Sequence, residues 1–154
     1  MNIKKSLSAA TLVLASFALI AGCKSRDPLV GTWAAKKNES ALSLTFSSDG
    51  TFTFRLMDAN EGLVVIQGTW KRKSTIHVEL EWLCFINDEK TVEPIKSTDI
   101  PQYLKGPLNA KVAENGSSLK LCMVSLNDSR AIEYAKTDLS GTELDKFLRT
   151  LSRS

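Results

Sequence analysis

The single histidine of this 154-residue chain limits the catalysis that the chain can perform. His77 alternates with Glu79 and Glu81, and neighbours on one face of a strand lie about 7 Å apart, so a weak metal site is geometrically possible. We favour a solvated strand face, because three basic residues at 71–73 lie across the adjacent turn. The chain contains no Gly-x-Ser-x-Gly, His-Glu-x-x-His, Gly-x-Gly-x-x-Gly or Walker A motif. We therefore predict that the protein is not an enzyme and holds no metal or cofactor.

The first of three cysteines follows a segment with the features of a secretory signal. Residues 1–5 include two lysines, residues 7–20 are uncharged and mostly apolar, and Ala21 and Gly22 precede Cys23. A spanning helix would need about 20 apolar residues, and charged residues end this run too early. The Ile-Ala-Gly-Cys sequence at 20–23 resembles the lipobox of bacterial lipoproteins. That resemblance implies cleavage before Cys23 and acylation of its thiol and amine. The alternative is an ordinary signal peptide with a cysteine at this place.

The lipobox resemblance divides the chain into a signal peptide at 1–22, an acylated cysteine with a short tether at 23–28, and one domain at 29–154. Lys24, and not aspartate, follows the cysteine. The resemblance therefore implies an anchor in the outer membrane of a Gram-negative bacterium, with the domain facing the periplasm. Loss of 22 residues leaves 132, with 18 basic and 17 acidic side chains. Such a neutral balance removes the electrostatic case for a nucleic-acid partner.

The other two cysteines, Cys84 and Cys122, would then lie in an oxidising compartment, where a pair is expected to join. Their disulfide would close a loop of 39 residues and stabilise the fold by roughly 3–4 kcal/mol. Two separate buried thiols are the alternative. One difficulty is that Cys122 shares its strand face with Lys120 and Val124, while Leu119 and Leu121 occupy the other face.

Alternation of apolar and polar residues predicts a chain rich in β-strands. Apolar side chains recur at every second position in 42–46, 52–56, 64–70 and 76–86, and turn sequences separate these runs. We expect the even-numbered residues of the last run, Cys84 among them, to face the core. Shorter strands are expected near 91–95, 109–113, 119–126 and 131–136, and the segment 87–118 contains three of the four prolines. A capping box at 140–143 predicts an amphipathic helix over 140–152 that packs on its own domain.

Two Gly-Thr-Trp sequences, at 31–33 and 68–70, flank an Asp-Gly-Thr-Phe sequence at 49–52. This order resembles the small lipocalin-like (calycin-type) domains of bacterial lipoproteins. The resemblance implies a mainly β fold, in which an antiparallel meander closes into a small barrel beside one C-terminal amphipathic helix. In such a barrel, glycine lets strands approach closely and the indole closes one end. An irregular β-sandwich is the alternative fold.

Five aromatic residues are the candidate lining of a binding site inside such a barrel. A lipocalin-like barrel would take a lipid or another small apolar molecule between them, as a non-catalytic binding module. Alternatively they only fill the interior, which is our preferred interpretation because small barrels leave little space. A second class of function is an envelope interaction or assembly protein, either a pilotin-like anchor of a secretion complex or an enzyme inhibitor. The five residues are Trp33, Phe52, Phe54, Trp70 and Trp82.

Overall fold

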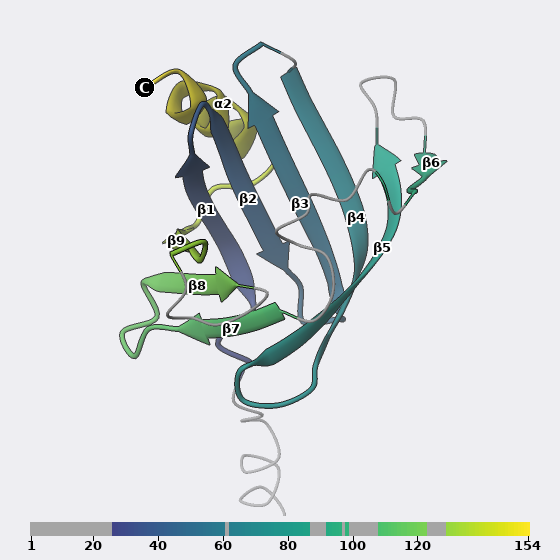
Figure 1. Cartoon of the computed structure of the whole chain (residues 1–154), viewed down its shortest axis with the longest axis vertical. Coiled ribbons are helices and arrows are strands. Elements are labelled where there is room, and N and C mark those ends of the chain that lie inside the picture. The colour runs from purple at the N-terminus through teal and green to yellow at the C-terminus, as the bar shows by residue number, and fades with distance from the viewer. Residues whose placement is uncertain (1–25, 61, 87–91, 97, 99–107, 123–128) are drawn as a thin grey trace, which may run out of the picture.

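A single antiparallel sheet of nine strands and one helix make up the described part of the chain (Figure 1). The computed structural model describes residues 26–60, 62–86, 92–96, 98, 108–122 and 129–154. The predicted signal peptide and Cys23 lie outside these residues. The elements are β1 (Gly31–Lys37), β2 (Ser40–Phe46), β3 (Thr51–Asp58), β4 (Gly62–Arg72), β5 (His77–Ile86), β6 (Val92–Pro94), β7 (Leu108–Val112), β8 (Ser118–Cys122), β9 (Ile132–Thr137) and α2 (Gly141–Arg153).

Eight of the strands close into a barrel. Their order is β4-β3-β2-β1-β9-β8-β7-β5, and pairing of β4 with β5 closes the ring. The three-residue strand β6 pairs with the end of β5 and lies outside the ring (Figure 1). The predicted barrel with one C-terminal helix is therefore confirmed, and the sandwich alternative is not the fold that forms.

The predicted alternation sets which side chains enter the barrel. Leu42, Leu44 and Phe46 of β2 pair with Leu56, Phe54 and Phe52 of β3, respectively. Five of these side chains are at most 1% exposed, and Leu56 packs against them while partly buried. Because successive side chains of a strand point to opposite faces, this register buries one apolar row from each strand.

Strand β5 departs from the predicted pattern. Gly68 pairs with Trp82 and Gln67 with Cys84, so Leu83 is an extra residue on β5, a β-bulge. Val78, Leu80 and Trp82 face the core before the bulge as predicted, but Phe85 faces it afterwards. The prediction that Cys84 faces the core is wrong, since one extra residue reverses the alternation. Ile76 precedes the strand and is 41% exposed, so its predicted place in the core is wrong as well.

The predicted disulfide between Cys84 and Cys122 does not form; both cysteines are free. The register explains this. Asn109 of β7 lies opposite Cys122 on one side and opposite His77 on the other. Cys84 is seven residues further along β5, about 23 Å at the usual rise of a strand. A disulfide needs Cα atoms within about 7 Å.

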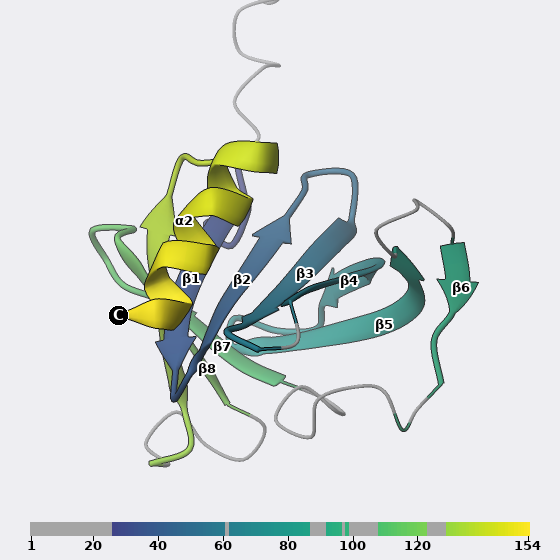
Figure 2. The ribbon, with the colours of Figure 1, turned by 90° about the horizontal axis from the view of Figure 1, so that it is seen from above.

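Helix α2 packs on the outside of the barrel, across β1, β2 and β3 (Figure 2). Leu144 and Leu148 are buried in a second, smaller core with Ala34, Ala41 and Met57. This confirms that the helix packs on its own domain. The predicted capping box forms only in part: Ser140 is the N-cap, but its hydroxyl makes no capping hydrogen bond.

Candidate ligand-binding site

Four of the five predicted aromatic residues meet in one cluster inside the barrel. The Trp82 ring makes edge-to-face contacts with Phe52 and Phe54, at centroid distances of 4.9 Å and 5.7 Å. Phe46 connects this group to Trp70, at 6.4 Å from Phe52 and 5.4 Å from Trp70. Such pairs stabilise by about 0.5–1.5 kcal/mol each beyond the area they bury.

Phe46 was absent from the predicted lining, although the sequence contains a signal for it. It occupies the same face of β2 as Leu42 and Leu44, and it pairs directly with Phe52 across the β2–β3 hairpin. Alternation in both strands of that hairpin places the Phe46 side chain on the same face as Phe52 and Phe54.

Gly68 makes room for the cluster. A Cβ atom at this position would lie 2.6 Å from Cε1 of Phe52 and 2.1 Å from the Glu81 carbonyl oxygen. Real Cβ contacts of that length essentially do not occur. The second Gly-Thr-Trp sequence therefore places Gly68, which has no side chain, against the Phe52 ring. The same sequence places the Trp70 indole at the end of the cluster.

Trp33 belongs to the same core but has a different environment. Its Nε1 donates a hydrogen bond to the Leu29 carbonyl at 2.8 Å, and Lys136 Nζ lies 5.3 Å from the ring centroid. Trp70 makes a similar bond, from Nε1 to the Ser47 carbonyl at 3.0 Å. Both indoles lie near the end of the barrel where β1 begins and β4 ends, which we call the tether end.

The opposite end, which we call the far end, contains inward-facing apolar side chains that the protein does not fully bury. Leu56 and Val64 pair beside the β3–β4 turn, and Phe85 of β5 pairs with Ile66 of β4. Leu56, Val64 and Phe85 pack against the core while remaining partly exposed, and so does Trp82, which pairs with Gly68 midway along β4. Because the bulge at Leu83 reverses the alternation, the sequence pattern did not identify Phe85 as an inward-facing residue. The buried members of the aromatic cluster fill the interior, whereas these four leave part of their apolar surface exposed.

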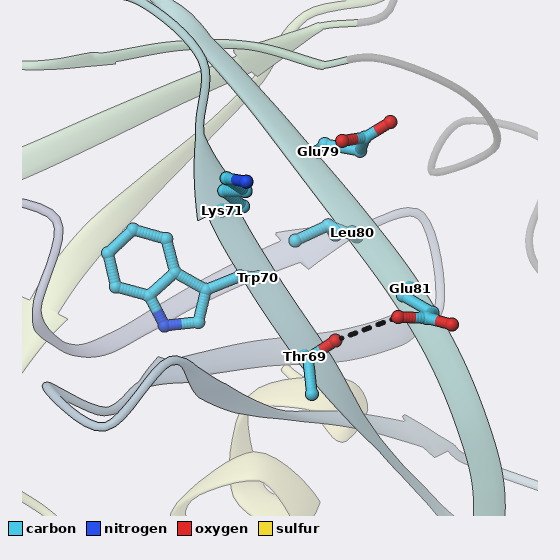
Figure 3. A pocket seen from close by; sticks show the side chains of 6 residues that line it. All are labelled: Thr69, Trp70, Lys71, Glu79, Leu80 and Glu81. Atoms are coloured by element: carbon cyan, nitrogen blue, oxygen red, sulfur yellow. Dashed lines mark hydrogen bonds between the residues drawn. The ribbon is translucent and has the colours of Figure 1, made fainter.

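A pocket of about 560 Å³ lies along β4 and β5. Figure 3 shows Trp70 extending to one side of the strand pair and Glu79 and Glu81 to the other. Thr69 donates a hydrogen bond to Glu81 at 3.2 Å. The hydrogen bond and charge of Lys73, at 2.7 Å, lower the pKa of Glu79 below its usual value. Both carboxylates of this pocket are therefore paired with neighbouring side chains.

His77 lies on that same face, with Nδ1 at 2.9 Å from the Ser74 hydroxyl oxygen. Within the described residues, His, Cys, Asp and Glu form no group of three or more that could hold a metal ion. None of the helices among those residues has the length and apolar character needed to cross a membrane.

Comparison with known proteins adds no relative. A scan against protein-family models and searches of curated proteins and of solved structures found no match to this chain.

Proposed function

We propose that this protein is a lipoprotein of the outer membrane, anchored through Cys23, whose barrel binds a small apolar molecule or acyl chain without catalysis. The observation that carries the ligand proposal is a set of partly exposed, inward-facing apolar side chains: Leu56, Val64 and Phe85 at the far end, and Trp82 midway along the barrel. An apolar ligand would complete the burial of these side chains. Full burial of such a side chain is worth about 1.5–3 kcal/mol.

The ligand proposal is tested on the mature chain carrying Cys23→Ser, which avoids the acyl chains. Native mass spectrometry should show a co-purifying apolar mass, and a long-chain fatty acid should change the tryptophan fluorescence, because Trp82 borders the site. Leu56→Gln and Phe85→Gln should weaken fatty-acid binding by about tenfold, as expected for loss of one buried apolar contact. Phe147→Ala, on the outer helix, is the matched control and should leave binding unchanged.

A bare protein mass together with unchanged fluorescence would contradict the ligand proposal. Circular dichroism melts of the two glutamine variants would separate loss of binding from loss of folding.

The anchor has its own test. Mass spectrometry of the wild-type N-terminus should find acyl groups on Cys23, and Cys23→Ser should move the protein from the membrane to the soluble periplasmic fraction. Membrane association that survives the substitution would rule out the anchor.

A second candidate function, an envelope interaction or assembly protein, is favoured by one surface. Leu83 is 49% exposed and Val92 is 63% exposed, and both lie on the β5–β6 hairpin. Exposed apolar side chains on one pair of strands are candidates for a protein contact. Crosslinking in the envelope should capture a reproducible partner that Leu83→Asp with Val92→Asp abolishes, and failure to capture one would reject this function.

A further inference from the structure

We infer that the tether end of the barrel rests against the lipid bilayer, with Ile76 at the membrane interface and the far end directed away from it. This inference rests on the proposed anchor at Cys23 and deepens it, because it says how the domain is held. Three observations carry it: an ion pair next to the tether, the reach of the tether, and the chemistry of the surface beside it.

The ion pair joins Asp27 to Arg72. Arg72 donates two hydrogen bonds of 2.6 Å to the two carboxylate oxygens of Asp27, and a third, of 2.9 Å, to the Thr75 carbonyl. Asp27 also accepts a hydrogen bond from the Leu29 amide at 2.9 Å. Two parallel bonds between a guanidinium and a carboxylate fix orientation as well as distance. The ion pair therefore holds the start of the domain against the β4–β5 turn. Thr75, whose carbonyl Arg72 contacts, immediately precedes Ile76.

The tether is too short to let the domain turn freely. Cys23 precedes Asp27 by four residues, and an extended chain of that length spans at most about 14 Å. If acyl chains hold Cys23 in the bilayer, the β4–β5 turn must lie within this distance of the lipid surface. The β3–β4 turn is at the other end of the 11-residue strand β4, about 33 Å away at the usual rise.

The surface beside the ion pair has the chemistry of a membrane contact. Ile76 is 41% exposed, and it borders a hollow of about 580 Å³ with Pro28, Val112 and Ala113 on its apolar side. Arg72, Lys111 and Glu114 also line this hollow. An apolar residue at a turn near Lys111 suits the interface, where a long cationic side chain keeps its charge among the headgroups, whereas the charge of Arg72 is paired with Asp27.

The far end, with Leu56, Val64 and Phe85, then faces away from the membrane. A ligand would enter from the periplasm and not from the bilayer that holds the anchor.

The test uses the acylated full-length protein, reconstituted in vesicles of phosphatidylethanolamine and phosphatidylglycerol that contain lipid brominated close to the headgroup. Bromine quenches tryptophan only at short range. Ile76→Trp should add fluorescence that the brominated lipid quenches, whereas Leu83→Trp, on the β5–β6 hairpin, should add fluorescence that it does not quench. Thr75→Trp is a second reporter at the same turn, in case Ile76→Trp does not fold. Equal quenching at the two places, or stronger quenching at Leu83, would overturn the orientation.

The role of the ion pair is tested with Asp27→Asn in the Ile76→Trp protein, which should lose the additional quenching while staying on the vesicles. Retained quenching would show that the ion pair does not orient the domain. The mass of the N-terminus is measured on the same sample. A mass without acyl groups would reject the anchor and the orientation together, whereas an acylated protein with equal quenching rejects the orientation alone.

Discussion

Asp27 shows how much one residue contributes when it joins distant parts of the chain. It lies 45 positions before Arg72 and holds the first described residues against the β4–β5 turn. The hydrogen bond from Arg72 is the largest cause that lowers the pKa of this carboxyl group, and the Leu29 amide lowers it further, while burial acts in the opposite direction. The same contacts raise the pKa of Arg72.

The lowered pKa of Asp27 gives a pH-dependent prediction. The folded protein binds the proton at this site more weakly than the unfolded chain, so the contribution to stability is complete above the ordinary carboxyl pKa of 3.8 and is lost as the pH falls through the folded value. Asp27→Asn should therefore cost about 1–2 kcal/mol in the free energy of unfolding at neutral pH. The difference from wild type should vanish under acid conditions.

Urea unfolding at several pH values measures this difference. Asp138→Asn, the same change at an exposed site, is the control and should have little effect. A stability difference for Asp27→Asn that does not change with pH would contradict the role assigned to the carboxylate.

Gly68 gives a prediction about space. Gly68→Ala should destabilise the fold by about 3 kcal/mol, because the added methyl group would meet the Glu81 carbonyl and the Phe52 ring. Gly116→Ala is the comparison: nothing lies within 4 Å, but the backbone φ is +69°, so the cost should be about 1 kcal/mol. Urea unfolding measures both, and an equal cost would show that crowding at Gly68 is relieved by a small shift of the strands.

At the scale of the element, α2 shows that an amphipathic pattern identifies the buried face of a helix but not its partner. Its apolar row contacts small outward-facing residues of the barrel, Ala34 and Ala41, together with Met57. Arg55 of β3 also pairs with Asp145 of the helix at 3.2 Å. The helix therefore packs on the outer face of β1–β3, and the aromatic cluster occupies the barrel interior.

The packing of α2 on the barrel can be tested by substituting two neighbouring residues of the helix. Leu148→Ala should reduce the free energy of unfolding by about 2–4 kcal/mol, because Leu148 is fully buried against the barrel. Phe147→Ala should cost less than about 1 kcal/mol, since this ring is 38% exposed. Similar costs for both substitutions would contradict the packing of the helix.

At the scale of the whole molecule, closure of the barrel decides which distant residues meet. Strand β5 joins β4 through eight residue pairs and β7 through two. This arrangement brings four aromatic residues of the predicted lining together through Phe46, but it keeps Cys84 and Cys122 apart. The thiol chemistry of the protein therefore follows from topology.

With Cys23 acylated as we propose, two thiols per chain should react with a thiol reagent when the protein is unfolded without a reductant, because Cys84 and Cys122 are free. In the folded protein the partly exposed Cys84 should react well before the buried Cys122. Cys84→Ser should remove the fast phase. Thiols that become reactive only after reduction would show that the disulfide forms after all.

Local patterning determined much of the fold. Alternation predicted strands β2 to β5 and the late hairpin, and helical spacing predicted α2, because both depend on neighbours only two to four residues apart. Alternation also placed Phe52 and Phe54 on one strand face, and both side chains are buried in the core. It failed at β5, where the bulge at Leu83 exchanged the roles of Cys84 and Phe85; a bulge arises from pairing with another strand and leaves no mark on a single run.

Sequence alone thus determined a β-rich chain with one outer helix, an aromatic set for its interior, and a lipobox-like start. Tertiary structure alone decided the pairing of Asp27 with Arg72, the separation of Cys84 from Cys122, and the partly exposed apolar residues at the far end. The physical reason is the range of the interactions. Periodicity reports contacts within one element, whereas ring closure and register depend on strands that meet across many tens of residues.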